Sequence, residues 1–247
     1  MQIPGILKKQ ILNTSSFKGS SMPAKKLIYS FVEYLQSQPA GFTFNEQVAK
    51  KSKREQLDAL YASYKKCRQC PLAVQGRTQI VFGEGNAESQ LMFIGEGPGK
   101  DEDEQGRPFV GRSGKLLTKI IEAMGIKRKD IFISNVVKCR PPGNRAPLPN
   151  ESVTCKKLLL FKEIEIIKPK IICTLGATAT KEILGNNIKI TKIRGQFFDL
   201  NGIKVMPTFH PAFLLRNPPA KREVWDDMKR IIENLSGSHP QTKALEK

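Results

Sequence analysis

Four of the five cysteines have a spacing that is typical of metal sites. Cys67 and Cys70 form a Cys-x-x-Cys pair, and Cys139 and Cys155 flank a segment rich in proline and glycine. Four thiolates suit either zinc or an iron-sulfur cluster, and their spacing alone does not separate the two. Because free cysteine is also a common core residue, four unrelated buried thiols are the alternative to a metal site.

The fifth cysteine has a different setting. Cys173 lies in the apolar run KIICTLG without a second thiol nearby in the sequence, so we expect it in the core. An odd number of cysteines in a chain without a recognisable secretion signal argues against a disulfide framework and for a reducing compartment.

Polar residues lie in or directly after several apolar runs. Glu96 lies in the loop GEGPG, whose glycines allow the backbone to approach a planar ligand closely. Asn135 lies inside an apolar run, and a buried amide without partners costs about 1 to 3 kcal/mol. His210 begins the segment HPAFLLRN and is the better candidate of the two histidines, since His239 lies near the chain end. The acidic residues 101–104 either line this site or form a solvated loop.

The glycine-rich segments do not match nucleotide-binding loops. Gly114 and Lys115 are followed by Leu116 and preceded, five positions before the glycine, by Phe109, so they do not form a P-loop. Lys100 stands where the last glycine of a dinucleotide-binding GxGxxG motif is required.

The apolar pattern predicts the frame that positions these residues. Four strand-sized apolar runs alternate with helical patterns, which predicts a three-layer α/β/α fold with a central, mainly parallel, four-stranded sheet. Ligands of such folds bind at the carboxyl ends of the strands, where the candidate residues and the turn LGATAT lie. The predicted strands are 91–95, 131–137, 170–176 and 204–209, and the predicted helices are 56–66, 114–124, 151–167, 177–184 and 221–235.

The chain divides into three parts. Residues 1–55 are predicted to be a partly disordered N-terminal extension of unknown role, with one amphipathic helix at 24–36, and residues 236–247 a polar tail. The start of the chain is basic and free of acids, so organelle targeting stays open; a bacterial chain of this kind is expected in the cytoplasm, at the nucleoid. No apolar run has the length of a membrane span.

The charge balance favours a polyanionic partner. Lysine and arginine number 41 against 23 acidic residues, a formal net charge of +18. A fold does not need such an excess, whereas nucleic acid binding benefits from it. Nucleic acid is therefore the leading class of partner.

Five motifs, in order and with the cysteine spacing, strongly resemble the thermophile-type, family 4 uracil-DNA glycosylases of the uracil-DNA glycosylase superfamily. They are GEGPG, GRPFVGRSGKLL, NVVKCRPPGNRAP, LGATAT and HPAFLLRN, and the resemblance covers residues 56–235. It implies that one four-iron, four-sulfur cluster is held by Cys67, Cys70, Cys139 and Cys155.

The resemblance also implies a role for each pocket residue. Phe109 would stack on the flipped base, Asn135 would pair with the edge of uracil, and His210 would donate a hydrogen bond to uracil O2. Gly97 stands where better-known uracil glycosylases have an aspartate that acts on water. Glu96 is then a candidate to position the water, and Glu102 a candidate to exclude the methyl group of thymine.

Other residues are implied at the DNA surface. Leu214 or Leu215 would fill the gap left by the flipped base and Arg216 would contact a phosphate. The cluster is expected to be structural and to present Arg140 and Arg145 to phosphates. Gly114 with Lys115, and the LGATAT turn, are further phosphate candidates through helix N-termini.

The function predicted from the sequence is removal of uracil from DNA by hydrolysis of its N-glycosidic bond, leaving an abasic site for base excision repair. A non-catalytic iron-sulfur DNA-binding protein on the same scaffold is the alternative. A monomer is expected, with uracil-containing DNA as substrate and a repair or replication partner left unspecified. A zinc-dependent hydrolase is disfavoured, because four cysteines leave no open coordination position.

Overall fold

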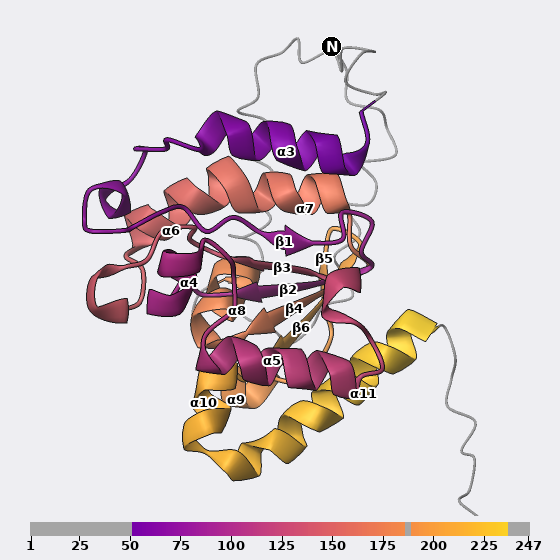
Figure 1. Cartoon of the computed structure of the whole chain (residues 1–247). Helices are drawn as coiled ribbons and strands as arrows, with labels where there is room; N and C mark the ends of the chain where they lie inside the picture. Colours follow the sequence, from indigo (N-terminus) through magenta and orange to yellow (C-terminus); the bar gives the residue numbers. More distant parts are fainter. Residues whose placement is uncertain (1–50, 186–188, 237–247) are drawn as a thin grey trace, which may run out of the picture. The chain divides into compact units, whose positions relative to one another are not determined.

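The computed structural model describes residues 51–185 and 189–236 (Figure 1). The helix predicted at 24–36, most of the predicted N-terminal extension, and residues 237–247 lie outside these ranges. In the described part of the chain, no helix is both long and apolar enough to cross a membrane.

A six-stranded sheet forms the centre of the domain, in the order β1-β3-β2-β4-β6-β5. The four central strands are parallel to one another, and the two outer strands are antiparallel to their neighbours. The predicted three-layer α/β/α fold is confirmed, but the sheet has two strands more than predicted. The strands are β1 (Glu84–Gly85), β2 (Leu91–Gly95), β3 (Phe132–Asn135), β4 (Ile171–Leu175), β5 (Phe198–Leu200) and β6 (Ile203–Thr208).

The two additional strands escaped prediction for different reasons. β1 has only two residues, too few for any periodicity. β5 and β6 are joined by Asn201 and Gly202, both with positive φ (52° and 85°). An Asn-Gly pair between two extended segments is a strong hairpin signal, and it was overlooked in the sequence.

Helices cover both faces of the sheet (Figure 1). One face is covered by α3 (Lys53–Tyr64), α6 (Pro149–Cys155), α7 (Phe161–Ile167) and α8 (Gly176–Leu184). The other is covered by α5 (Arg112–Ala123), α9 (Ile190–Ile193), α10 (Pro211–Arg216) and α11 (Lys221–Ser236). The remaining elements are α4 (Lys100–Gln105) and the short segments η2 (Pro71–Ala73), η3 (Arg128–Asp130), η4 (Pro142–Asn144), η5 (Lys156–Leu160) and η6 (Pro218–Ala220).

Most predicted helices differ from the structure by one or two residues at an end, and two differ more. α3 begins at Lys53 and not at Gln56, because Ser52 and Glu55 form a capping box in which each side chain accepts the backbone N–H of the other residue. The helix predicted over 151–167 is divided by a π-helical segment, η5, that begins directly after Cys155. Segments of this kind often lie next to functional sites.

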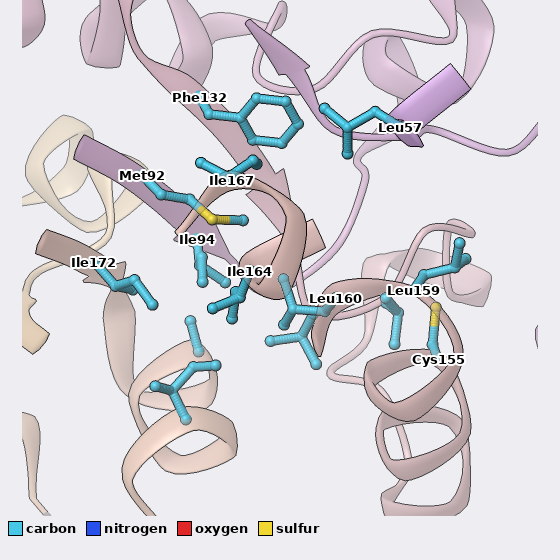
Figure 2. Close-up of a cluster of buried hydrophobic side chains, with 14 of the residues drawn as sticks. Leu57, Met92, Ile94, Phe132, Cys155, Leu159, Leu160, Ile164, Ile167 and Ile172 are labelled. Atoms are coloured by element: carbon cyan, nitrogen blue, oxygen red, sulfur yellow. The ribbon is translucent and has the colours of Figure 1, made fainter. Parts of the chain in front are cut away.

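Buried side chains fill the space on both sides of the sheet. On the face shown in Figure 2, Met92, Ile94 and Ile172 from the strands pack against residues of α7 such as Ile164 and Ile167. Neighbouring strand residues point to the opposite face and form a second cluster with α5, α10 and α11. The central strands are therefore apolar on both faces, which explains their continuous apolar runs in the sequence.

Phe132 offers a direct test of this core. Its ring is fully buried in the cluster of Figure 2. We expect Phe132→Ala to lower the free energy of unfolding by about 3 to 5 kcal/mol, because it removes apolar contacts and leaves a cavity. Val74→Ala is the control, since Val74 is 75% exposed, and its effect should stay within about 0.5 kcal/mol. Chemical denaturation measures both, and equal effects would contradict the packing described.

Candidate active site and cysteine site

Parallel pairing of β2 and β3 places a glycine beside the buried amide of Asn135. Gly95 of β2 is the register partner of Asn135 in β3. A Cβ atom added at Gly95 would lie 2.5 Å from Asn135 Oδ1 and 2.4 Å from a ring carbon of Phe109. The ring and the amide therefore approach the same point, and only glycine leaves room for both.

His210 completes this group from a third strand. It follows the end of β6 and lies at the N-terminus of α10. The ring centroids of Phe109 and His210 are 5.7 Å apart, with an angle of 35° between the planes. Three residues predicted to handle one base, Phe109, Asn135 and His210, are thus brought together in the fold.

The side-chain oxygen of Asn135 is an unsatisfied acceptor. Asn135 is only 2% exposed, and its Oδ1 has no hydrogen-bond partner among the residues that the structure describes. A buried polar atom in this state costs about 1 to 3 kcal/mol, which a ligand with a matching donor would recover. The site therefore offers a free acceptor to a ligand that donates a hydrogen bond at this point.

His210 is a neutral imidazole with a defined tautomer. Burial, together with the positive charge of Arg216, lowers the pKa of His210 from 6.5 to about 4. Its Nδ1 accepts the backbone N–H of Ala212 at 3.1 Å and so carries no proton. The single proton of the neutral ring is then on Nε2, which has no hydrogen-bond partner in the described part of the chain and can donate to a ligand.

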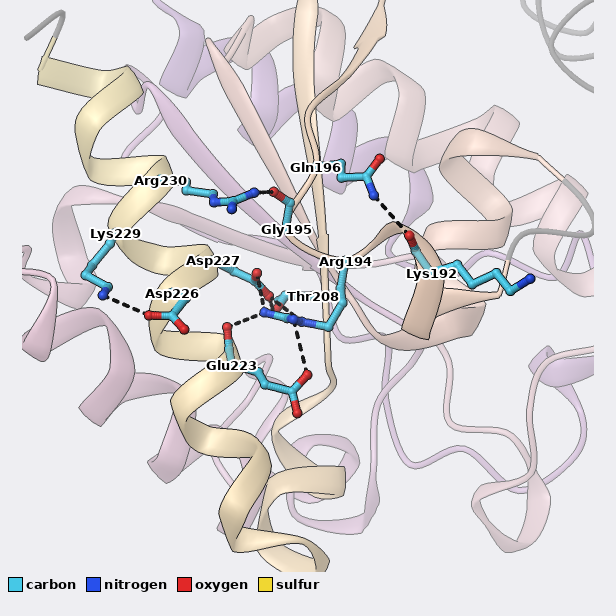
Figure 3. A network of polar contacts seen from close by, with 10 residues as sticks. All are labelled: Lys192, Arg194, Gly195, Gln196, Thr208, Glu223, Asp226, Asp227, Lys229 and Arg230. Carbon is cyan, nitrogen blue, oxygen red and sulfur yellow. Dashed lines mark hydrogen bonds and ion pairs between the residues drawn. The ribbon is translucent and has the colours of Figure 1, made fainter. Parts of the chain in front are cut away.

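A polar network holds the strand end that leads to His210 (Figure 3). Thr208 Oγ1 donates to the carboxylate of Asp227 on α11 at 2.6 Å, and Arg194 Nε donates to the same carboxylate at 3.1 Å. Asp227 is 1% exposed, and burial raises the pKa of its carboxyl group, against the effects of Thr208 and Arg194. The hydrogen bond from Thr208 to Asp227 thus fixes α11 against β6, two residues before His210.

The LGATAT turn supports His210 from behind. Gly176 has a φ of +89°, and a Cβ atom added there would lie 2.9 Å from Cβ of His210. The glycine is needed for this close approach. The turn was predicted as a phosphate site, but the structure places Gly176 against the histidine.

Phe109 has an unusual backbone that several contacts hold in place. Its φ is +54°, in the left-handed region that is unfavourable for an aromatic residue. Glu102 Oε1 accepts the N–H groups of Val110 and Gly111, both at 2.9 Å, while Oε2 accepts the N–H of Gly99 at 3.1 Å. Glu102 therefore connects the GEGPG loop to the loop of Phe109.

Gly114 supports the same loop and is not a surface residue. A Cβ atom there would lie 2.0 Å from the carbonyl oxygen of Phe109, so the helix start is packed directly on this backbone. Arg128 Nη2 donates to the neighbouring carbonyl of Pro108 at 2.6 Å. The prediction that Gly114 contacts DNA is corrected, because the residue is buried, whereas Lys115 beside it is exposed.

The acidic run folds into helix α4 and is not a solvated loop. Asp103 is 2% exposed, and its carboxylate accepts the backbone N–H groups of Thr78 and Gln79. Glu96 is partly buried, and its carboxylate has no hydrogen-bond partner among the described residues. Gly97 is packed so closely that a Cβ atom would lie 2.8 Å from a methyl group of Val137.

A groove of about 450 Å³ lies between α4, the start of α5 and α10. The three cations of its lining, Lys100, Arg112 and Arg216, outnumber the two carboxylates of Asp101 and Glu102. Leu215 adds an apolar side chain that is 45% exposed. Leu214 is different. It is 1% exposed and packs in the second core cluster, so the prediction of Leu214 at the DNA surface is wrong.

The four predicted metal-binding cysteines line one cavity together with Arg77 and Lys138. Burial raises the pKa of the Cys155 thiol to about 12, and it also raises the pKa of the Cys139 thiol, which Arg77 opposes. No group of side chains in the described ranges is arranged to hold a single metal ion. Cys173 lies apart from the cavity, fully buried in β4, as expected of a core residue.

Two of the cavity sulfurs accept hydrogen bonds. Arg77 Nη1 donates to Cys139 Sγ at 2.8 Å, and the backbone N–H of Lys138 donates to Cys155 Sγ at 3.3 Å. Donors of this kind stabilise the negative charge of metal-bound thiolates. Four convergent thiols with such donors fit an iron-sulfur cluster.

The arginines near the cysteine site differ in how free they are. Arg145 forms a two-pronged ion pair with the buried Glu151, at 2.7 and 2.8 Å, which neutralises its charge. Arg140 donates to the side-chain oxygen of Asn144. The predicted phosphate contact is thus better suited to Arg140 than to Arg145.

Known proteins share this chain's sequence over most of the domain. The model of the uracil DNA glycosylase superfamily matches residues 82–229. The type-4 uracil-DNA glycosylase of Thermotoga maritima is 48% identical over 183 residues, which are 73% of this chain and 91% of that protein. The corresponding protein of Saccharolobus solfataricus is 44% identical over 191 residues, 74% of this chain and 88% of that protein. The chain belongs to the type-4 uracil-DNA glycosylases.

For this type-4 uracil-DNA glycosylase, the resemblance predicted from five motifs is confirmed. A third relative, the type-4 enzyme of Archaeoglobus fulgidus, is 37% identical over 194 residues, 75% of this chain and 96% of that protein. Sequence reasoning nevertheless missed Arg77, Arg128, Lys138 and Asp227. For Lys138 a signal was present. Like Asn135, this lysine lies in an apolar run, NVVKC, where a polar side chain needs hydrogen-bond partners.

His210 should make the stability of the fold depend on pH. With a folded-state pKa of about 4 and an ordinary value of 6.5, the unfolded chain binds a proton that the folded chain does not. The resulting stabilisation is complete above pH 6.5 and is lost as the pH falls towards 4.

Between about pH 7 and pH 4.5 we therefore expect the wild type to lose about 2 kcal/mol more than His210→Asn, as measured by urea denaturation. The amide of the variant retains the helix cap but does not titrate. Equal losses in the two proteins would show that His210 has an ordinary pKa in the folded state.

Proposed function

We propose that this enzyme flips uracil out of DNA into the pocket of Phe109, Asn135 and His210 and hydrolyses its N-glycosidic bond. The oxygen of a water molecule adds to C1′ of the sugar, the bond from C1′ to N1 of uracil breaks, and the base leaves with the bonding electrons. The proton that the water loses neutralises the departed uracil anion. An abasic site and free uracil result, the first step of base excision repair. The observation that supports this best is the buried, unpaired Oδ1 of Asn135 beside an aromatic ring and a neutral histidine.

Asn135 would distinguish uracil from cytosine. Its Oδ1 accepts a hydrogen bond from N3–H of uracil, and its amide N–H donates to O4. Cytosine has no proton on N3 and carries an amino group at C4. The Oδ1 acceptor would therefore face another acceptor, and the amide N–H would face another donor. Groups left unpaired in a buried site give strong discrimination, and this explains why the pocket keeps an unsatisfied oxygen.

His210 would stabilise the departing base. As the glycosidic bond breaks, negative charge develops on the uracil ring, including O2. A neutral Nε2–H donor held in place by the Ala212 N–H stabilises that charge without a proton having to move. Phe109 would stack on the base, a contact worth about 1 to 3 kcal/mol per base.

We assign two tasks to the GEGPG loop, which are to position the attacking water and to stabilise charge on the sugar. The carboxylate of Glu96 is available to orient a water or to stabilise positive charge on the sugar, and the tight loop at Gly97 presents backbone. Glu102 was predicted to exclude the thymine methyl group. Since its described contacts are with backbone N–H groups, we propose that it acts mainly by holding the loop of Phe109.

One four-iron, four-sulfur cluster would be held by Cys67, Cys70, Cys139 and Cys155. When bound, it supplies a structural tie and no chemistry of hydrolysis, because breaking this bond transfers no electrons. The residues of this chain around it join the segment before η2 to the loop after β3 and to α6. Arg77 and the Lys138 N–H are placed to stabilise the charge of the sulfurs.

DNA would bind along the groove between α4, α5 and α10. Lys100, Arg112 and Arg216 are suited to phosphates, and Leu215 to the gap left by the flipped base. Lys115 and, beside the cysteine site, Arg140 remain proposed phosphate contacts. We propose that the enzyme acts as a monomer and, in a bacterial cell, in the cytoplasm at the nucleoid.

Two pocket substitutions test the function. A labelled duplex with one uracil opposite guanine is incubated with iron-loaded protein, and alkali then cleaves any abasic site. We expect cleavage at the uracil by the wild type, with single-turnover rates lower by about a hundredfold in both His210→Ala and Asn135→Ala. Lys229→Ala, an exposed residue of α11, is the control. Iron-loaded wild-type protein that binds the duplex without cleaving it would refute the proposal.

Two cysteine substitutions test whether the cluster is present. We expect Cys139→Ala to lose bound iron and visible colour, to unfold at a lower denaturant concentration and to bind DNA more weakly, because the segments tied by the cluster separate. Cys173→Ala should retain its iron, since Cys173 lies outside the cavity. A colourless Cys139→Ala protein with wild-type stability and activity would show that no structural cluster exists.

A further inference from the structure

A lysine and a glutamate form a fully buried ion pair between the cysteine site and the candidate uracil pocket. The side chains of Lys138 and Glu163 are 1% and 0% exposed, and Nζ lies 2.7 Å from Oε2. Burying two charges removes their hydration, and an apolar pair of similar size is often at least as stable. Stability alone therefore does not explain this pair.

The ammonium group of Lys138 holds the end of β3. Besides Glu163, it donates to the carbonyl oxygen of Asn135 at 2.8 Å and to the hydroxyl oxygen of Ser134. These are the last two residues of β3. The lysine thus fixes the backbone of the residue whose amide is proposed to recognise uracil.

Glu163 is itself held from three sides. Tyr61 donates its hydroxyl to Oε1 at 2.9 Å, Ser134 donates to Oε2 at 2.7 Å, and the N–H of Gly83 donates to Oε1 at 3.3 Å. Burial and the charge of Glu163 raise the pKa of Tyr61, so the phenol keeps its proton and remains a donor. The carboxylate that pairs with Lys138 is therefore fixed in position.

The backbone of Lys138 reaches the cysteine site. Its N–H donates to Cys155 Sγ at 3.3 Å, its carbonyl accepts the N–H of Val81 at 2.7 Å, and the next residue is Cys139. One residue therefore contacts both a proposed cluster ligand and the carbonyl of Asn135.

We propose that Lys138, held by Glu163, is a positioning residue that fixes Asn135 for uracil recognition and joins it to the cysteine site. The inference rests on the proposed function. It predicts that breaking the pair weakens recognition of the base itself, while the DNA groove, which lies between other elements, is little affected.

The test compares Lys138→Met and Glu163→Gln with Lys53→Met, all as iron-loaded proteins with their iron content measured. Lys53 is a matched control because its ammonium bonds to the Ile167 carbonyl and to Glu88, away from β3. Three quantities are measured: the single-turnover rate of uracil removal at saturating DNA, the inhibition constant of free uracil, and the Kd for an undamaged duplex.

For both variants of the pair we expect the rate to fall at least tenfold and the inhibition constant of free uracil to rise by a similar factor. The Kd for undamaged DNA should stay within about twofold of wild type, and Lys53→Met should match wild type in all three. If Lys138→Met and Glu163→Gln do not fold, Ser134→Ala takes their place, because it removes one hydrogen bond of Lys138 and one of Glu163. We expect it to change the same two quantities by about threefold.

Wild-type rate and uracil inhibition in a folded variant of the pair would overturn the inference. So would a Kd for undamaged DNA that rises as much as the inhibition constant of free uracil. If Ser134→Ala alone folds, wild-type values in that protein overturn it. Failure of the wild type to remove uracil would instead refute the proposed function.

Discussion

The pocket depends on the contact between β2 and β3 at Gly95 and Asn135. Parallel pairing sets these residues side by side, and the missing side chain of Gly95 lets the ring of Phe109 and the amide of Asn135 meet. A methyl group at this point would displace either the aromatic ring or the amide. The left-handed backbone of Phe109, the packing of Gly114 and the bridging carboxylate of Glu102 all maintain the same contact.

Charge is distributed in a way that suits chemistry on a base inside a polyanion. The formal net charge of +18 serves attraction to DNA, and cations line the groove beside the pocket. At the pocket itself, the histidine is neutral and the asparagine is uncharged. A neutral donor stabilises a developing anion most when water is excluded, and the low pKa of His210 is a consequence of the same burial.

The charged groups buried in the core have a related purpose. Asp227, which pairs with Arg194, accepts a hydrogen bond from Thr208 and so fixes the strand that leads to His210 (Figure 3). Lys138 with Glu163 fixes the strand that ends at Asn135. Both networks act on strand ends, where a rigid sheet meets the loops of the pocket. Rigid support of this kind is what a site needs when a small displacement of a hydrogen-bonding group reduces the rate.

The sequence predicted the architecture and most of the pocket, because buried strands and their following loops leave clear patterns. Phe109, Asn135 and His210 were found and do converge, although their roles remain proposals. It was harder to predict which side chains of a short helix are buried. Leu214 and Leu215 are neighbours in sequence, yet only Leu215 is exposed. Support by contacts distant in sequence was invisible, which is why Gly114 and Glu102 were predicted at the ligand and not beneath it.

The most direct test of the central claim is a crystal structure of the iron-loaded enzyme with free uracil bound. The account predicts uracil against the ring of Phe109, with N3–H bonded to Oδ1 of Asn135 and O2 bonded to Nε2 of His210. Uracil bound elsewhere, or bound with Oδ1 of Asn135 still unpaired, would contradict it.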